Sequence, residues 1–147
     1  MESDLTTLYV LCGLPGSGKT TLSKMLSDKY SAVRYSLDEM RTSRGENNDR
    51  KLIHSMILES LSEGFDVVYD DLNIYKTDRL NLLNSLKDIQ CNKILIVMTT
   101  PLEECIIRDS DRQRKIGEKI IKYLRGRYQP PTLEEGWSDI FLINGKE

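Results

Sequence analysis

Short apolar runs alternate with amphipathic stretches along the chain, and the two patterns predict different elements. Five runs rich in β-branched and aromatic residues predict strands, at residues 8–12, 32–37, 65–69, 93–98 and 140–143. Strands that alternate with helical patterns indicate a parallel sheet with crossover helices. The run 93–98 is the most continuously apolar of the five, so we place its strand at or near the centre of the sheet.

Helical spacing of apolar positions is clearest over residues 49–63 and 77–89, and Gly64 is well placed to end the first of these helices. Thr100 and the two residues after it predict another helix start, with threonine as the N-cap, proline at the first helical position and Glu103 completing a capping box. Gly117 then separates this helix from a further one, and two prolines at 130–131 close the segment.

Residues 13–20, Gly-Leu-Pro-Gly-Ser-Gly-Lys-Thr, form a complete phosphate-binding loop between an apolar strand and a helical pattern. The glycines let the backbone curl with positive φ and bring N–H donors around an anion. Lys19 would reach the terminal phosphates, and Thr20 offers its hydroxyl to Mg²⁺. We predict that ATP, or another nucleoside triphosphate, binds with Mg²⁺. The predicted nucleotide-binding residues of the loop are Gly13, Pro15, Gly16, Ser17, Gly18, Lys19, Thr20 and Thr21.

Composition narrows the class of protein. The 147 residues are 39% hydrophobic and 30% charged, which suits a single globular domain over residues 1–147. No apolar run approaches the roughly 18 residues of a membrane span, and the acidic first residues lack the positive charge of a secretory signal. We therefore expect a cytoplasmic protein with no membrane partner and no evident obligate protein partner. Cys12, Cys91 and Cys105 are odd in number and widely spaced, which predicts buried reduced thiols.

The net charge of −2 means that a nucleic-acid partner would need a local basic surface. Residues 108–127 supply one, since eight basic against three acidic residues give +5. We call this segment the lid; its alternative interpretation is an ordinary solvated helical face. His54, the single histidine, lies in a helical stretch where we expect no catalytic role, and Trp137 is expected to pack beside the last strand.

Asp38 and Arg41 stand just past the second predicted strand, three residues apart, so on one helical turn they share a face. A kinase that acts on an alcohol needs such a pair, because the carboxylate accepts the hydroxyl proton and the arginine holds the acceptor in line. On spacing alone, a helix-capping aspartate beside a surface arginine is the favoured interpretation.

Two further pairs of charged residues, later in the chain, could take part in the same chemistry. Asp70 and Asp71 end the third predicted strand, where side chains alternate, so we expect only one of them to face a cleft. That one would orient the acceptor-site arginine or the water shell of Mg²⁺, or would cap the next loop with Asn73. Arg108 and Arg112 are spaced i, i+4 and share a face. Both could neutralise charge on the transferred phosphoryl group when the lid covers ATP.

In their order and spacing these motifs resemble the kinase domain of the polynucleotide 5′-hydroxyl kinase family, within the phosphate-loop kinases. The matching segments span nearly the whole chain, at residues 13–20, 36–41, 67–73, 108–112 and 128–131 ahead of 135–136. The resemblance implies a three-layer P-loop kinase fold, α/β in class. Its five-stranded, mostly parallel sheet would have the order 2-3-1-4-5, flanked by helices, with a basic helical lid at about residues 108–127.

The resemblance also implies roles for individual residues. Asp38 would be the general base, Arg41 would hold the phosphate next to the acceptor hydroxyl, and Asp70 would support Arg41. Arg108 and Arg112 would belong to the lid over the donor phosphates. With Lys19, the predicted catalytic set is then Lys19, Asp38, Arg41 and Arg112.

These features favour transfer of the γ-phosphate of ATP to the 5′-hydroxyl end of DNA or RNA. A basic surface should then lead to Asp38, and its candidates are Arg41, Arg44, Arg50 and Lys51. A kinase of a small-molecule alcohol shares the loop, the aspartate and the lid, and would have a closed, largely uncharged acceptor pocket. A nucleotide-dependent switch protein is a third alternative, against which stands the lack of Asn-Lys-x-Asp and Asp-x-x-Gly elements. Many members of the polynucleotide kinase family carry a phosphatase or ligase module, and these 147 residues contain none. End healing by this chain alone would then stop at the 5′ phosphate.

Overall fold

The computed structural model describes residues 5–145. The acidic chain start that argued against a secretory signal lies outside this range. In chain order the elements are β1 (Thr7–Cys12), α1 (Lys19–Tyr30), β2 (Val33–Ser36), α2 (Glu46–Ser62), β3 (Val67–Asp70), α3 (Lys76–Ser85), β4 (Asn92–Met98), α4 (Leu102–Ser110), α5 (Glu118–Arg127), a 3-10 turn (Leu133–Glu135) and β5 (Asp139–Ile143).

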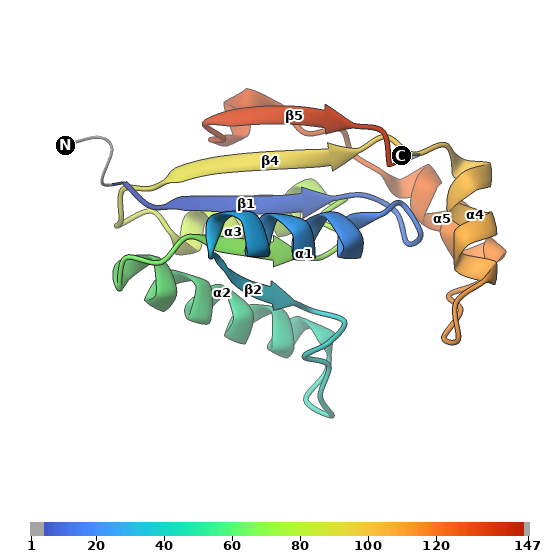
Figure 1. The fold of residues 1–147 in the computed structure, drawn as a ribbon, viewed down its shortest axis with the longest axis horizontal. Coiled ribbons are helices and arrows are strands. Elements are labelled where there is room, and N and C mark those ends of the chain that lie inside the picture. Colours follow the sequence, from blue (N-terminus) through green and yellow to red (C-terminus); the bar gives the residue numbers. More distant parts are fainter. Residues whose placement is uncertain (1–4, 146–147) are drawn as a thin grey trace.

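The five strands form one sheet in the order β2-β3-β1-β4-β5, and every neighbouring pair is parallel. The predicted order 2-3-1-4-5 is therefore confirmed. Leu22 and Leu26 of α1 pack on one face of the sheet, whereas Ile53 of α2 and Leu82 of α3 pack on the other. The result is a helix–sheet–helix sandwich, with α4 and α5 standing beyond the carboxyl ends of the strands (Figure 1).

Several element boundaries differ from the predicted ones for local reasons. Helix α2 begins three residues before the predicted position, directly after Gly45, whose φ of 97° is a left-handed conformation that favours glycine. Gly64 follows the end of α2 with a φ of 94°, as predicted. Phe65 is 51% exposed and precedes the paired residues of β3. Helix α3 ends at Ser85, so its last predicted turn is irregular.

The predicted capping box at the start of α4 is wrong. Pro101 occupies the N-cap position, and no side chain caps the helix. The hydroxyl of Thr100 instead donates to the carbonyl oxygen of Ser17 at 2.7 Å. This contact ties the end of β4 to the phosphate loop.

The structure bears on the state of the cysteines and on the presence of membrane-spanning helices. Cys12, Cys91 and Cys105 are all buried and free, as expected. Across residues 5–145, no helix combines the length and the apolar character needed to cross a membrane.

A buried ion pair fastens the segment that returns from α5 to the sheet. Arg79 of α3 is 0% exposed and forms two hydrogen bonds of 2.9 Å with the carboxylate of Glu135. It also donates to the carbonyl oxygen of Asn73 at 2.9 Å, and the indole of Trp137 donates to Glu135 at 3.0 Å. Burial alone would raise the pKa of Glu135, but the hydrogen bonds from Arg79 and Trp137 outweigh it and lower that pKa.

Removing one partner of this pair should destabilise the protein strongly. We expect Arg79→Leu to lower the free energy of unfolding in urea by about 3–5 kcal/mol, because Glu135 would remain as an uncompensated buried charge. The double variant Arg79→Leu/Glu135→Leu should recover much of this loss. Lys122→Gln, which breaks the exposed pair with Glu118, is the control and should leave the urea midpoint unchanged. An Arg79→Leu midpoint equal to that of the control would contradict this interpretation.

His54 is a buried residue of α2 that packs edge-to-face on Tyr69, with 5.8 Å between the ring centroids. Burial lowers its pKa to about 4, although the nearby Asp71 opposes this shift. The unfolded chain, with a pKa of 6.5, therefore binds the proton more readily than the folded one.

The contribution of neutral His54 to stability should consequently be complete above pH 6.5 and decline as the pH falls toward 4. His54→Phe removes this titration, so its unfolding free energy should fall less steeply over that interval. Urea unfolding of both proteins at several pH values measures the difference. Parallel curves would show that His54 does not titrate differently in the two states.

Candidate active site

The phosphate loop connects β1 to α1 and is held tightly by its surroundings. Gly16 and Gly18 have φ values of 81° and 100°, a region that side chains rarely adopt. A Cβ on Gly16 would lie 2.3 Å from the carbonyl oxygen of Cys105 in α4. Glycine is thus required here both for the backbone turn and for the close approach of α4.

Lys19, the first residue of α1, is only 8% exposed, and its Nζ donates to the carbonyl oxygen of Leu14 at 2.9 Å. Burial lowers its pKa, an effect opposed most by the nearby carboxylate of Asp70. The amine lies at the base of the loop, where an anion would restore the charge balance of the buried cation.

A cavity of about 980 Å³ opens beside the loop. Its lining contains most of the predicted site, namely Pro15, Gly16, Gly18, Lys19, Thr20, Thr21, Asp38, Arg41, Asp70, Arg108 and Arg112. Gly13 and Ser17 do not line it. They form the buried support of the loop, since a Cβ on Gly13 would lie 2.8 Å from the Ser17 hydroxyl.

The cavity fits a nucleotide with Mg²⁺. The positive φ values of Gly16 and Gly18 curl the loop backbone at the start of α1, and Lys19 supplies a buried cation. Within residues 5–145, no group of three or more histidine, cysteine or acidic side chains could enclose a metal ion. Mg²⁺ does not need such a group, because it keeps several waters and binds phosphate oxygens, so Thr20 has only to contribute one hydroxyl.

Asp38 and Arg41 form an exposed ion pair on the turn after β2, with 3.0 Å between Oδ1 and Nη2. The side chains are 55% and 48% exposed, respectively, and both line the cavity that contains Lys19. The predicted sharing of one face is therefore correct. It arises on a turn and not on a helix.

The two aspartates at the end of β3 have different partners from those predicted. Asp70 accepts from the hydroxyl of Ser23 at 3.0 Å and pairs with Arg34 at 3.3 Å, so it supports Arg34 and not Arg41. Asp71 also lines the cavity, contrary to the expectation that only one would. Strand alternation fails here because β3 ends at Asp70.

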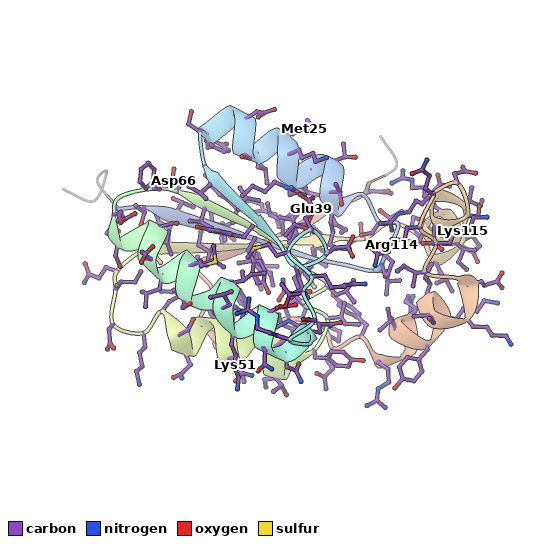
Figure 2. All side chains as sticks on the ribbon, turned by 90° about the horizontal axis from the view of Figure 1, so that it is seen from below. Met25, Glu39, Lys51, Asp66, Arg114 and Lys115 are labelled. Atoms are coloured by element: carbon purple, nitrogen blue, oxygen red, sulfur yellow. The ribbon has the colours of Figure 1, made fainter. Side chains whose placement is uncertain are left out.

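Asp71 is the centre of a second charge cluster. It accepts from Nε of Arg50 at 2.8 Å and from the hydroxyl of Tyr69 at 2.6 Å. Burial by itself would lower the pKa of Arg50, but Asp71 and Glu46 outweigh it and raise that pKa. Arg50 is only 12% exposed. The expectation that Arg50 belongs to an open basic surface leading to Asp38 is therefore wrong. Lys51, by contrast, lies on the outer side of α2 (Figure 2).

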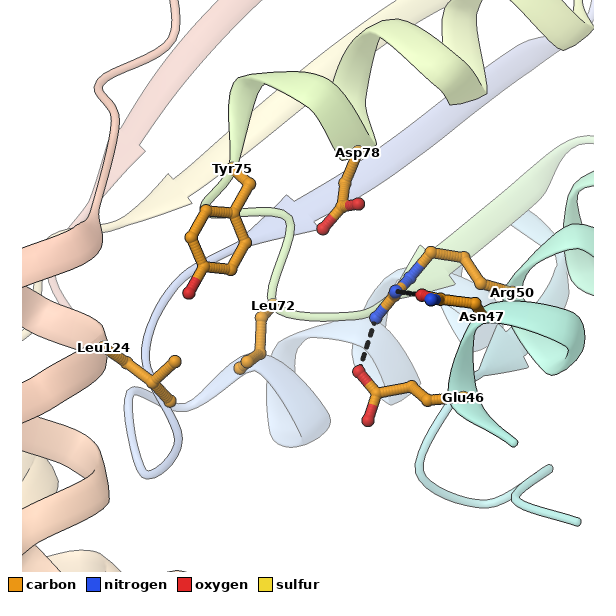
Figure 3. Close-up of a pocket in the computed structure, with 7 residues that line it drawn as sticks. All are labelled: Glu46, Asn47, Arg50, Leu72, Tyr75, Asp78 and Leu124. Carbon is orange, nitrogen blue, oxygen red and sulfur yellow. Dashed lines mark hydrogen bonds and ion pairs between the residues drawn. The ribbon is translucent and has the colours of Figure 1, made fainter. Parts of the chain in front are cut away.

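A smaller cavity of about 360 Å³ adjoins the large one on the side of α2 and α3. The two share Glu46, Leu72 and Leu124 in their linings. Figure 3 shows Asp78 of α3 and Tyr75, the residue before that helix, on one side of the pocket, and the Arg50–Glu46 pair on the opposite side. Burial raises the pKa of Asp78. This pocket is polar and charged, unlike the closed, uncharged acceptor pocket expected for a small alcohol. Its full lining is Glu46, Asn47, Arg50, Leu72, Tyr75, Asp78 and Leu124.

The lid consists of the end of α4, a turn and α5. Arg108 donates to the carbonyl oxygen of Gly145 and lies beside Gly18. Arg112 follows the end of α4 and is 3.7 Å from Asp109. The carboxylate of Asp109 holds the turn by accepting from the backbone N–H groups of Ile116 at 2.9 Å and Gly117 at 2.8 Å. Arg114 and Lys115 lie on this turn and are both exposed (Figure 2).

Sequence reasoning missed Thr100 and Gly145, which complete the wall beside the loop. The backbone N–H of Gly145 donates to the Thr100 hydroxyl at 3.1 Å. A Cβ on Gly145 would lie 2.3 Å from the Ser17 carbonyl oxygen. One signal was present, because both residues follow strands of the predicted parallel sheet and so belong to its carboxyl edge.

Residues 7–144 match the sequence model of the family described as chromatin associated protein KTI12. The chain belongs to the KTI12 family. A curated relative, the L-seryl-tRNA(Sec) kinase of Methanococcus maripaludis, is 30% identical over 142 aligned residues, which cover 88% of this chain and 55% of that protein. The chain therefore spans about half the length of this relative.

Solved structures show the same fold. The Kti12 of Chaetomium thermophilum in complex with ADP-AlF3 has a TM-score of 0.75 and 22% identity, over 93% of this chain and 88% of that one. A fungal RNA kinase also has a TM-score of 0.75, with 18% identity, over 95% of this chain and 38% of that one. Membership of the KTI12 family, together with these folds, makes the chain a P-loop kinase-type protein. The likeness to the RNA kinase is one of fold alone.

Gly145 provides a test of the wall beside the loop. Gly145→Ala should weaken binding of MgATP by about tenfold or more, or about 1.4 kcal/mol, because the new Cβ must displace Ser17 or Thr100. Isothermal titration calorimetry measures the affinity, and circular dichroism checks that the fold is kept. Gly126→Ala is the matched control, since nothing lies within 4 Å of its Cβ position. Equal affinities of the two variants would contradict the role of Gly145.

Proposed function

We propose that this protein is an ATP- and Mg²⁺-dependent kinase that transfers the γ-phosphoryl group to a hydroxyl carried by RNA. The observation that carries the proposal is the common cavity, into which the phosphate loop, the Asp38–Arg41 pair and the lid arginines all open. When bound, MgATP supplies the phosphoryl group, and the rest of the chemistry is positioning and charge stabilisation by the side chains around it.

Each side of the cavity has its own task in this proposal. The loop backbone and Lys19 hold the donor phosphates, and Thr20 contributes its hydroxyl to Mg²⁺. Asp38 accepts the proton of the attacking hydroxyl, while Arg41 fixes the group that bears it. Arg108 and Arg112 neutralise the charge that develops as the phosphoryl group is transferred.

Two observations support RNA as the carrier of the acceptor hydroxyl. The relative with 30% identity is named for a tRNA substrate, and a structure with the same fold is an RNA kinase. Exposed cations also stand close to Asp38 in the chain: Arg41 lines the cavity with it, and Arg44 follows three residues later and is 58% exposed. A polyanion chain can follow such a surface.

The acceptor that we propose first is a 5′-hydroxyl end. Arg41, at 3.0 Å from Asp38, is placed to hold the first phosphate of a chain whose 5′-hydroxyl faces the carboxylate. A second candidate is the hydroxyl of a seryl group on tRNA, which the name of the curated relative supports. DNA ends and small alcohols are the remaining acceptors to compare.

Transfer of label from γ-labelled ATP tests the function and the role of Asp38 together. The acceptors are a 5′-hydroxyl oligoribonucleotide, its DNA counterpart, seryl-tRNA and a small polyol. We expect label on RNA, and we expect Asp38→Asn to reduce kcat by about 10²- to 10⁴-fold with little change in the affinity for ATP. Asp28→Asn, an exposed aspartate of α1, is the control and should retain the full rate.

The outcomes separate the alternatives. Lys19→Ala should abolish transfer with the fold retained, and a normal rate would remove the loop from the donor role. Label on the polyol alone would favour a small-molecule kinase, and hydrolysis without label on any acceptor would favour a nucleotide-dependent switch. A normal rate of Asp38→Asn would exclude Asp38 as the base.

A further inference from the structure

Helix α5 presents two neighbouring stripes of side chains at the mouth of the cavity. Ile116, just before the helix, and Ile120 and Leu124 within it line the cavity at intervals of four residues. Lys119 and Tyr123 precede two of these positions by one residue, so their stripe runs along the edge of the cavity-lining one. The first stripe forms part of the cavity wall, and the proposed function gives the second stripe no role.

The second stripe combines an exposed ring with cations. Tyr123 is 60% exposed, and the guanidinium of Arg127, one turn further on, lies over its ring at 5.9 Å from the centroid. Among residues 5–145, neither Lys119 nor Arg127 forms a salt bridge. On another side of the helix, Lys122 is paired with Glu118 at 2.6 Å. The uncompensated charge of α5 therefore includes the stripe beside the cavity.

Such a stripe has the chemistry of a single-stranded RNA contact. A tyrosine ring or a guanidinium plane stacks on an unpaired base, and neighbouring lysine and arginine groups hold phosphates. The chain as a whole has a net charge of −2, while the lid carries +5, so a polyanion is drawn to this segment in particular. An apolar protein partner would not make use of the two cations.

The stripe is also continuous with the acceptor side of the site. Leu124, next to Tyr123 in the chain, lines both cavities, and in Figure 3 it faces Leu72 and the ring of Tyr75 across the smaller one. The larger cavity contains Asp38. A nucleotide held on α5 therefore lies at the border of the cavity in which the acceptor hydroxyl would react.

We propose that Lys119, Tyr123 and Arg127 form a binding surface for an unpaired nucleotide of the RNA acceptor, stacked on the Tyr123–Arg127 pair near the reacting end. The proposal rests on the proposed function, since it names how the RNA of that reaction is held. It assigns the outer face of the lid to the acceptor, in addition to the donor role of Arg108 and Arg112.

Fluorescence anisotropy with a 3′-labelled, 5′-hydroxyl single-stranded oligoribonucleotide tests the surface. Tyr123→Ala should weaken binding by about 5- to 100-fold, the range expected for the loss of one stacked base. Tyr123→Phe should keep most of the affinity, because the ring remains. Lys122→Gln, which removes a cation of the same helix that is already paired, is the control and should bind like the wild type.

Salt dependence separates stacking from charge. Arg127→Gln should reduce the slope of log affinity against log salt by about 0.7, the value for one phosphate contact on a single strand. Tyr123→Ala should leave that slope unchanged. A duplex of the same sequence should not distinguish Tyr123→Ala from the wild type, because its bases are already stacked.

The results distinguish this inference from the proposed function. If the wild type labels RNA and Tyr123→Ala binds RNA equally well, the surface is wrong and the kinase stands. If Tyr123→Ala loses RNA binding but the wild type labels no RNA, the surface stands and the kinase assignment fails. No RNA binding by the wild type would overturn both. Equal losses in Tyr123→Ala and Lys122→Gln would reduce the surface to a diffuse basic face.

Discussion

The site depends on the close backbone packing around the phosphate loop. On one side the carbonyl of Cys105 leaves no room for a Cβ on Gly16, and on the other the end of β5 brings Gly145 against Ser17. Strand register makes this possible, because Cys12 pairs with Val97 and Met98 pairs with Ile143, so three neighbouring strands end at the same level. The loop is therefore shaped by three elements and not by its own glycines alone.

The three aspartates that line the large cavity differ in how firmly neighbouring side chains hold their carboxylates. Asp70 is fixed by Ser23 and Arg34, and Asp71 by Arg50 and Tyr69, all within the packed structure. Asp38 is the exception, since it is more than half exposed and its partner Arg41 is nearly as open. An exposed ion pair is weakly held and easily exchanged. A carboxylate of this kind can change its partner during a reaction, whereas the buried ones keep the frame in place.

Much of the fold could be predicted from the sequence, because alternating patterns and a phosphate loop restrict the topology to few solutions. The pairing of Asp38 with Arg41 was also predictable from spacing, since both lie on one short turn. Partners distant in sequence were not predictable. Arg34 reaches Asp70 and Arg50 reaches Asp71 only because β2 and α2 lie beside β3 in space. The local sequence predicted Thr100 as a helix cap. Its hydroxyl instead contacts Ser17, which is 83 positions away in the chain.

The double role of α4 limits how the molecule can adapt when both substrates are bound. The helix supplies the Cys105 carbonyl that closes off the loop and also carries Arg108 at the cavity. Swinging the whole helix outward would open a gap under the loop and release its grip on the donor. The arginine side chains and the short connection between α4 and α5, tethered at its base by Asp109, can rearrange without moving that carbonyl. The proposed phosphoryl transfer would therefore rely on small local movements and not on the large rigid-body closure of a hinged cap.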